Sequence, residues 1–334
     1  MAEKFVQNGE ISLWTEDFGD ASDPTVLLMR GIGGTGVTWS LSFCEFLVKN
    51  GYHVIRYDQR DSGLSSYVDY NHHPYRLIDL AADVVCILDS YRVKKAHVIG
   101  ISMGGFVSQM VAIHFPERVK TLTLFSSTLN FRPQILAAFG ISTGWMKLPG
   151  PKSDVVRTLK TALSHPDDSL VLTDDDFLVH QYVELAKICN GGNAPFDPQE
   201  WKDELDIIRK HENFQGQPYG ISNSAHAVAK GPIHIHSEKI RCPVLIIHGS
   251  RDPIIPVKHA RALAHAIPNA KRIIVYGMGH AISQKYFDEI IDVALVNFLR
   301  DSSAETNKPM VHERIATDVC NFWHNLFSVF WHKA

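Results

Sequence analysis

The stretch that most constrains how this chain can fold is residues 96–106. It opens with an apolar run of strand length and continues with Gly100 to Gly104, which spell G-x-S-x-G. From Met103 onward, apolar residues recur with helical spacing. A strand, G-x-S-x-G and a helix in this order are typical of a nucleophile elbow, in which a serine occupies a sharp, strained turn. We therefore predict that Ser102 presents its hydroxyl at such a turn, because side chains at positions 100 and 104 would crowd it.

Strand and helix patterns alternate on both sides of this stretch. Apolar runs of strand length lie at 25–29, 53–57 and 119–125, and helical patterns separate them. This alternation predicts an α/β fold with a mostly parallel sheet and crossover helices on both faces. At the N-terminus, Asn8 and Gly9 stand between two short alternating runs and predict a β-hairpin with a type I′ turn.

The pattern changes after residue 130. Residues 131–236 carry helical patterns without a convincing buried strand, and strand patterns resume at 243–249. We therefore predict a core made of residues 1–130 and 237–300, with residues 131–236 as an inserted helical cap. The helices expected in the cap lie at 135–139, 155–163, 177–188 and 201–211.

The end of the chain has a different character. Residues 301–310 are polar, and an amphipathic stripe of aliphatic and aromatic residues follows between 315 and 331. We interpret residues 301–334 as a linker plus an amphipathic C-terminal helix. Such a stripe has to be covered, so we expect it to dock on its own chain or to join a second subunit in a homo-oligomer.

A glycine-rich loop follows the strand at 25–29 and permits two interpretations. Gly31, Gly33 and Gly36 match the G-x-G-x-x-G fingerprint of dinucleotide-binding loops, and Asp58 lies where the ribose ligand is expected. This match supports an NAD-dependent oxidoreductase as an alternative class of protein.

The other interpretation is that this loop forms half of an oxyanion hole. Its small residues would let the Ile32 N–H approach the nucleophile, and the Met103 N–H at the start of the elbow helix would be the second donor. Two observations favour this interpretation. A hairpin precedes the strand, and residues 59–65 are turn-like, whereas a dinucleotide-binding unit continues with a helix there.

Two further residues follow strands of the predicted sheet. Asp252 comes just after the strand at 243–249, and His280 comes just after the strand at 272–276. Catalytic groups gather at the carboxyl ends of parallel strands. Ser102, Asp252 and His280 therefore stand in the order of a hydrolase triad, nucleophile first, then acid, then base.

Composition excludes several other classes. The formal net charge is -3 and no long basic run is present, so a nucleic-acid partner is not expected. The five cysteines are scattered without a C-x-x-C pair, and the N-terminus has no apolar signal region, so a reducing cytoplasm is expected. No apolar stretch reaches membrane-spanning length. His234 and His236 form an H-x-H pair, but without an acidic or thiol partner at ligand spacing we predict no metal site.

The chain resembles the α/β-hydrolase family over residues 25–130 and 240–300. The motifs that carry the resemblance lie at 57–65, 100–104, 115–119 and 277–280. Within the family the chain is most similar to bacterial carboxylic-ester hydrolases of the aclacinomycin methylesterase type, on residues 53–63 and 79–85. One departure is Arg30, since many members have His before the oxyanion glycine.

The resemblance implies the same chemistry as the residues themselves. Ser102 would attack an ester carbonyl, His280 would act as base, and Asp252 would orient the imidazole. The N–H groups of Ile32 and Met103 would stabilise the oxyanion, and no cofactor would be needed. Methyl, aryl and short-chain esters and lactones all remain open as small-molecule substrates. A non-catalytic receptor on the same fold is the remaining alternative.

Overall fold

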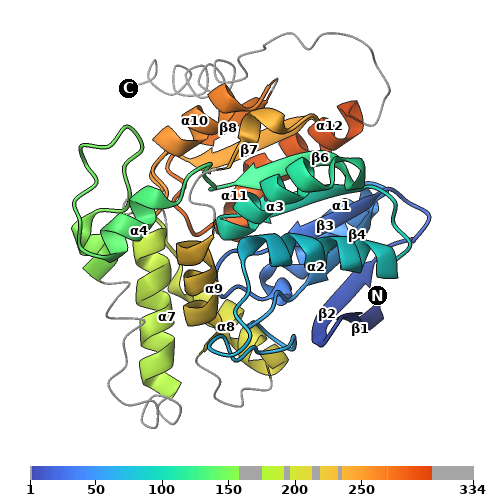
Figure 1. Ribbon diagram of the computed structural model, residues 1–334, viewed down its shortest axis with the longest axis horizontal. Coiled ribbons are helices and arrows are strands. Elements are labelled where there is room, and N and C mark those ends of the chain that lie inside the picture. The colour runs from blue at the N-terminus through green and yellow to red at the C-terminus, as the bar shows by residue number, and fades with distance from the viewer. Residues whose placement is uncertain are drawn as a thin grey trace, which may run out of the picture.

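The computed structural model describes residues 2–157, 175–191, 196–212, 219–231, 235–268 and 270–302. Its centre is an eight-stranded sheet in the order β1-β2-β4-β3-β5-β6-β7-β8 (Figure 1). The strands β1 and β2 are antiparallel to each other, β2 is antiparallel to β4, and the remaining pairs are parallel. The strands are β1 (Ala2–Asn8), β2 (Ile11–Phe18), β3 (Thr25–Met29), β4 (His53–Tyr57), β5 (Ala96–Ile101), β6 (Val119–Phe125), β7 (Val244–Gly249) and β8 (Lys271–Val275).

Helices connect the parallel strands, which confirms the predicted α/β architecture. The helices are α1 (Leu41–Lys49), α2 (Leu77–Ser90), α3 (Met103–His114), α4 (Arg132–Ala138), α7 (Asp175–Cys189), α8 (Pro198–Glu212), α9 (Tyr219–Lys230), α10 (Lys258–Ala266), α11 (Gln284–Tyr286) and α12 (Asp292–Asp301). Short 3-10 turns lie at Gly36–Thr38, Pro116–Arg118 and Ser237–Lys239, and a π-helical stretch, Phe287–Ile291, joins α11 to α12.

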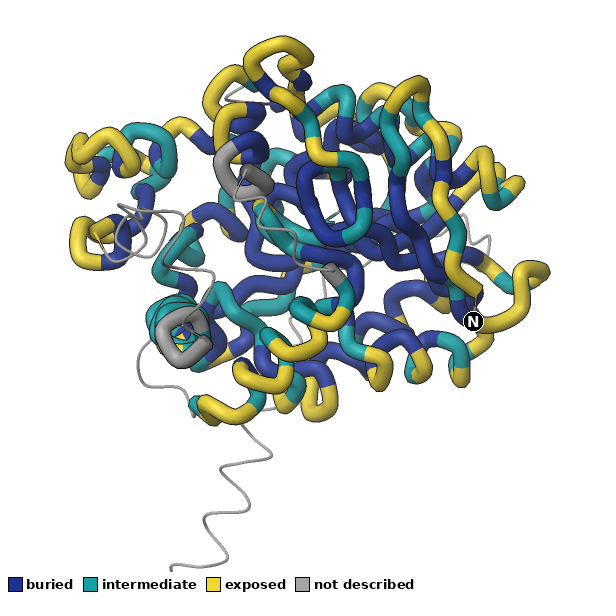
Figure 2. Tube along the Cα trace, turned by 90° about the horizontal axis from the view of Figure 1, so that it is seen from below, coloured by how far each residue is buried: buried dark blue, intermediate teal, exposed yellow. Residues whose placement is uncertain are grey.

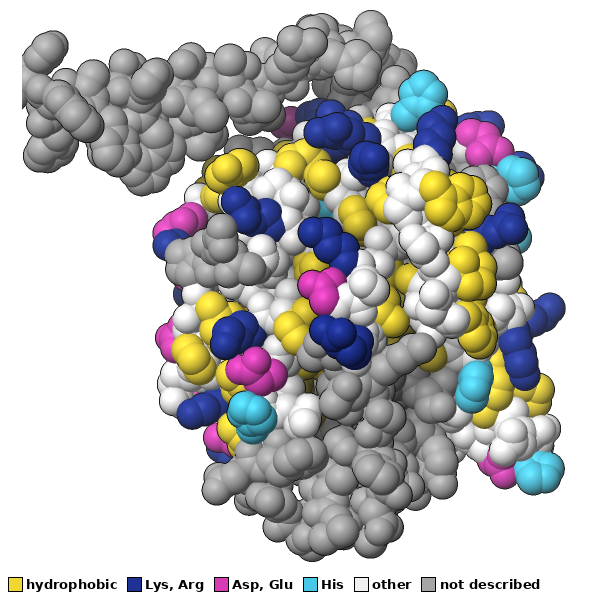
Figure 3. Space-filling model, turned by 90° about the vertical axis from the view of Figure 1, so that its left-hand side faces the viewer, with side chains coloured by type: hydrophobic (Ala, Val, Ile, Leu, Met, Phe, Trp, Pro, Cys, Tyr) yellow, Lys and Arg dark blue, Asp and Glu magenta, His cyan; other side chains and the backbone are white. Residues whose placement is uncertain are grey.

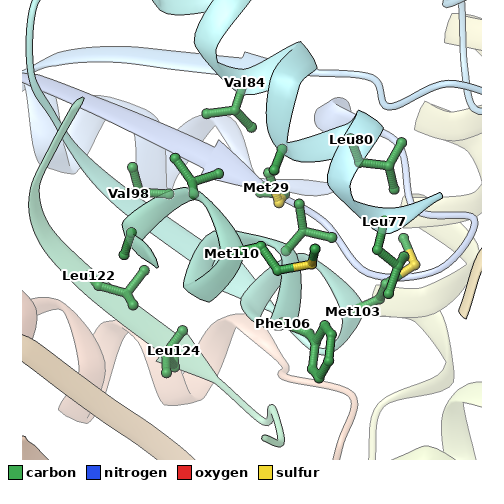
Figure 4. Close-up of a cluster of buried hydrophobic side chains, with 14 of the residues drawn as sticks. Met29, Leu77, Leu80, Val84, Val98, Met103, Phe106, Met110, Leu122 and Leu124 are labelled. Atoms are coloured by element: carbon green, nitrogen blue, oxygen red, sulfur yellow. The ribbon is translucent and has the colours of Figure 1, made fainter. Parts of the chain in front are cut away.

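The sheet is buried on both faces because successive strand residues point to opposite sides. On β3, Leu27 and Met29 face the layer formed by α2, α3 and α10, whereas Val26 and Leu28 face α1 and α12. Figure 4 shows Met29 packed with side chains of β5, β6, α2 and α3, and Figure 2 shows the buried strands at the centre of the molecule. Each fully buried aliphatic side chain of this kind contributes ~1.5–3 kcal/mol relative to exposure.

The N-terminal hairpin is present, but its turn differs from the predicted type I′. Asn8 pairs with Ile11, so the two loop residues are Gly9 and Glu10. Gly9 has a φ of 62°, and neither Asn8 nor Glu10 has a positive φ. A positive φ at the first loop residue alone is the pattern of a type II′ turn, in which glycine takes that position.

Two helical segments differ from what the sequence pattern predicts. The apolar pattern over residues 286–300 predicts one closing helix, but the structure has a π-helical stretch there that separates α11 from α12. The helix α9 was not predicted, because half of its buried face is polar, with Asn223 and Ser224 as buried as Ala227 and Val228. The expected helix at 155–163 lies partly outside the described residues.

The chain leaves the sheet after β6 and returns to it at β7. In between, α4, α7, α8 and α9 group together beside the sheet (Figure 1). On the face shown in Figure 3, apolar side chains are exposed between scattered Lys, Arg and acidic side chains. Among the described residues, no helix has the length and apolarity that a membrane span requires. Residues 303–334, with the predicted C-terminal helix, lie outside the described residues.

Candidate active site

Ser102 occupies the strained turn that the G-x-S-x-G pattern predicts. It follows β5 and precedes α3, with φ 54° and ψ -118°, a conformation that non-glycine residues rarely adopt. Its N–H donates to the Phe125 carbonyl of β6 at 2.9 Å, which ties the turn to the sheet. A Cβ at Gly100 would lie 2.5 Å from the Gly104 carbonyl oxygen, and a Cβ at Gly104 would lie 2.3 Å from the Arg30 carbonyl oxygen. Only glycine fits either position.

The loop after β3 lies against this turn. A Cβ on Gly31 would be 3.1 Å from Ser102 Cβ and 3.6 Å from Ser102 Oγ, so the loop backbone packs on Ser102. Within the part of the chain that the structure describes, neither the Ile32 N–H nor the Met103 N–H donates a hydrogen bond. Both donors are therefore available to an anion, and Met103 adds the partial positive charge of the α3 N-terminus.

Two residues after β4 hold this loop in place. Gln59 Nε2 donates to the Arg30 carbonyl at 2.5 Å, which fixes the backbone just before Gly31. Asp58 is fully buried, and its carboxylate accepts the N–H of Gly36 at 2.7 Å and of Leu64 at 2.9 Å. Both residues belong to the motif at 57–65, but its spacing does not show which atoms they bind.

These contacts make the dinucleotide interpretation wrong. The carboxylate of Asp58, expected to hold a ribose, binds the N–H of Gly36 inside the protein. A Cβ on Gly36 would lie 2.7 Å from the Tyr57 carbonyl oxygen, so this glycine is required by packing against β4. The following helix begins only at Leu41. The loop therefore does not end at a helix N-terminus, where a pyrophosphate would bind.

Asp252 and His280 form a hydrogen-bonded pair at the carboxyl ends of β7 and β8. His280 Nδ1 lies 2.8 Å from Asp252 Oδ2. The other carboxylate oxygen of Asp252 accepts the N–H of Ile254 at 2.9 Å and of Ile255 at 2.8 Å. With Nδ1 bound to a carboxylate, the neutral imidazole carries its proton there and leaves Nε2 as the basic nitrogen.

The surroundings keep Asp252 ionised. Burial would raise the pKa of this carboxyl, but the charge and hydrogen bond of His280 outweigh it, with smaller contributions from His248 and the Ile255 N–H, so the pKa lies below its ordinary value. His248 was not predicted. Its Nε2 donates to the Ile255 carbonyl at 2.7 Å, which braces the Asp252 turn, and burial lowers the pKa of its imidazole.

Ser102, Asp252 and His280 thus follow β5, β7 and β8, at the carboxyl ends of these parallel strands. Among the described residues, no hydrogen bond joins Ser102 Oγ to His280. Nucleophile–base contacts are commonly long before substrate binds. The structure thus shows the Asp252–His280 hydrogen bond directly and places Ser102 at the carboxyl ends of the same parallel strands.

The H-x-H pair is only partly within the described residues. His234 lies outside them, and His236 Nδ1 lies 2.8 Å from Glu238 Oε1. Among the residues that are described, no group of three or more His, Cys, Asp or Glu side chains is arranged to hold a metal ion.

Known families match both ends of the chain. A model of the α/β hydrolase fold matches residues 24–150, and a model described as a TAP-like protein matches residues 225–310. Rhodomycin D methylesterase of Streptomyces peucetius is 33% identical over 287 residues, which cover 84% of this chain and 93% of that protein. The chain therefore belongs to the α/β-hydrolase fold family.

Other relatives agree with this assignment. The 3-oxoadipate enol-lactonase 2 of Acinetobacter baylyi is 26% identical over 77% of this chain and 82% of its own length. A crystal structure of a hydrolase from Pseudomonas aeruginosa has the same fold, with a TM-score of 0.65 and 24% identity, covering 89% of this chain and 98% of that one. The expected resemblance to bacterial methylesterases is confirmed, and with it the expectation of a carboxylic ester hydrolase.

Proposed function

We propose that this chain cleaves its ester through an acyl-enzyme on Ser102, with His280 as the general base and Asp252 as the acid that orients it. The observation that carries the proposal is the strained backbone of Ser102 beside two N–H groups that have no partner in the described residues. A strained turn persists only where its surroundings enforce it, and it exposes the hydroxyl next to donors for a developing anion. The Asp252–His280 pair at the same sheet edge supplies the base.

The reaction then runs in two halves. Ser102 Oγ attacks the ester carbonyl carbon while His280 Nε2 takes its proton, and the N–H groups of Ile32 and Met103 bind the resulting oxyanion. Collapse of this intermediate breaks the bond to the alcohol, which leaves with the proton from His280. A water molecule attacks the acyl-enzyme in the same way, His280 again accepting and returning the proton, and releases the acid.

We further propose a methyl ester on a bulky, aromatic carboxylic acid as the substrate. The support is the rhodomycin D methylesterase that matches 84% of this chain. Residues 131–236 would form the cap that covers the carboxyl edge of the sheet and shapes the acyl pocket. The enol-lactonase relative makes lactones the second class to test.

A hydrolysis screen tests both parts of the proposal. It compares methyl esters of aromatic polyketides, aryl esters, short-chain esters and lactones. Ser102→Ala and His280→Ala should each lower kcat on the best substrate by roughly 10⁴–10⁶-fold, and the double variant should be little worse than either. A serine-directed phosphonate should add once, at Ser102. A folded Ser102→Ala protein with unchanged turnover would refute the mechanism, and a preference for short acyl chains would refute the substrate class.

A further inference from the structure

The loop that carries His280 is held by helices inserted between β6 and β7. We call residues 276–283, between β8 and α11, the base loop. The helix α7 ends at Cys189, whose carbonyl accepts the N–H of His280 at 2.6 Å and of Ala281 at 3.2 Å. Carbonyls in the last turn of a helix have no partner within the helix. Here the Cys189 carbonyl accepts a hydrogen bond from the backbone N–H of His280, the residue proposed as the base.

This contact is tight. A Cβ on Gly279, beside His280, would lie 2.2 Å from the Cys189 carbonyl oxygen. Just past α7, Gly191 has a φ of 82°, and a Cβ there would lie 2.6 Å from the Arg251 carbonyl oxygen. Arg251 directly precedes Asp252 in the chain. The end of α7 therefore packs on both loops that carry the acid–base pair, with no space left for movement toward them.

The helix α8 holds the far end of the base loop. Glu200, in the first turn of α8, accepts the N–H of Gln284 at 2.6 Å through Oε1. Gln284 is the first residue of α11, where the base loop ends. The two helices are also joined to each other, because the Tyr182 hydroxyl of α7 donates to Glu204 of α8. The base loop is thus held at His280 by α7 and at Gln284 by α8.

We call the glycine-rich loop at residues 30–36 the oxyanion loop, and the other end of α8 reaches its support. His211 Nε2 lies 2.6 Å from Asp58 Oδ2, and its ring packs edge-on against Trp14 with centroids 4.3 Å apart. The same Asp58 carboxylate binds the N–H of Gly36. One helix therefore connects the support of the base loop with the support of the oxyanion loop.

We propose that the α7–α8 pair positions His280 for catalysis, with Glu200 as a positioning residue. The inference rests on the proposed function, since it takes His280 to be the base. Misplacing a catalytic group by about 1 Å can lower the rate by ~10²-fold. Without the Cys189 and Glu200 acceptors, backbone N–H groups of the base loop would lack partners, and the loop would shift to find others. The inserted helices then affect kcat as well as substrate choice.

A matched pair of glycine substitutions tests the role of α7. Gly191→Ala and Gly51→Ala place the same side chain at the same φ, 82°, and Gly51 lies between α1 and β4, at the amino end of that strand. A Cβ on Gly51 would meet nothing within 4 Å, whereas one on Gly191 would press on Arg251. We expect Gly191→Ala to lower kcat by roughly 10–100-fold with KM changed less than about twofold, and Gly51→Ala to leave both unchanged.

Glu200 is tested by two substitutions that remove different parts of it. Glu200→Ala removes the acceptor for the Gln284 N–H, and Glu200→Gln keeps an oxygen there. We expect kcat to fall about tenfold in Glu200→Ala and to be largely restored in Glu200→Gln, at an unchanged melting temperature in the Gln variant. If Gly191→Ala does not fold, the two Glu200 variants still test whether the α7–α8 pair positions His280.

Ser102→Ala and His280→Ala, measured in parallel, separate the inference from the function beneath it. Full activity in those two variants would overturn the proposed mechanism. If both lose activity while folded Gly191→Ala and Glu200→Ala keep the parent kcat, the mechanism stands and the positioning role is refuted. An equal loss of kcat in Gly51→Ala would also refute it, because the effect would then lack any link to the base loop.

Discussion

The two halves of the candidate site are held by different parts of the molecule. On the nucleophile side, the N–H of Ser102 donates to a β6 carbonyl, and Gln59 fixes the oxyanion loop from the end of β4. On the base side, the N–H of His280 donates to the last carbonyl of α7, outside the sheet. The backbone of Ser102 is thus held by the sheet, whereas the backbone of His280 is held by an inserted helix. A substitution at the end of α7 can therefore change catalysis through the base half alone.

The largest expected effect is on the acid–base pair itself. Asp252→Asn keeps an oxygen for the N–H groups of Ile254 and Ile255, so the protein should fold. The amide no longer enforces the tautomer with a free Nε2 on His280, so we expect kcat to fall by roughly 10³–10⁴-fold. Steady-state kinetics beside Asp89→Asn, an exposed carboxyl of α2, measures this loss. A loss below tenfold would mean that His280 does not rely on Asp252.

Hydrogen exchange should separate the two halves directly. The N–H of Ser102 is bonded within the sheet, so its exchange requires near-global unfolding, whereas the N–H of His280 is released when the α7 end opens. We expect exchange at His280 to be at least ~100-fold faster, which corresponds to about 2.8 kcal/mol of opening free energy. Mass spectrometry of peptides covering 96–106 and 276–284 measures it. Glu200→Ala should accelerate hydrogen exchange only in the 276–284 peptide. Equal exchange rates at Ser102 and His280 in the parent protein would contradict the different support of the two halves.

A smaller effect is expected from the support of the oxyanion loop. Gln59→Ala removes the hydrogen bond to the Arg30 carbonyl, an interaction worth ~1–2 kcal/mol inside a protein. If the oxyanion loop positions the Ile32 N–H for the transition state only, kcat should fall about tenfold in Gln59→Ala while KM stays constant. Gln7→Ala, an exposed glutamine of β1, is the matched control. A change in KM alone would instead place Gln59 in substrate binding.

The smallest effect concerns the core side and should leave catalysis untouched. Burial, with a smaller contribution from Asp288, raises the pKa of the Asp292 carboxyl to about 7. Because the folded value exceeds the unfolded one of 3.8, the stability that this group contributes is complete below pH 3.8 and is lost as the pH rises through 7. Asp292→Asn stays neutral, so its melting temperature should exceed the parent's at pH 8 by on the order of 2 °C.

The same variant should show no gain near pH 4, where the parent carboxyl is also neutral in the folded state. Glu289→Gln, an exposed carboxyl on the same stretch, should shift the melting temperature at neither pH. A pH-independent gain in Asp292→Asn would mean that packing, and not ionisation, is responsible. Turnover should remain at the parent level throughout.

The sequence was most informative where structure is set locally. The elbow was predicted because its requirements, a strand, two glycines around Ser102 and a helix, lie within a few neighbouring residues. Asp252 and His280 were predicted because parallel strands deliver their ends to one edge. The dinucleotide interpretation failed because glycine spacing alone does not tell a cofactor-binding loop from a closely packed one. Gly36 is a glycine because it packs against the Tyr57 backbone.

The supports of the site could not be predicted in this way. The Cys189 carbonyl acts through the backbone, so no side-chain type marks it, and its partner His280 lies far along the chain. Glu200 and His211 resemble surface residues of an amphipathic helix until their partners Gln284 and Asp58 are known. Such contacts depend on how an inserted segment folds back on the sheet, which periodicity does not encode.

The open sheet also bears on how copies of this chain behave in a crowded solution. The strands β1 and β8 are its two edges, where unpaired backbone groups could recruit a strand from another molecule. β8 is short and begins with Lys271 and Arg272. The Nζ atom of Lys271 lies 3.6 Å from Oδ2 of Asp301. β1 carries Glu3 and Lys4 near its start. Charged side chains on both edge strands oppose aggregation by sheet extension, so self-association would have to use a different surface.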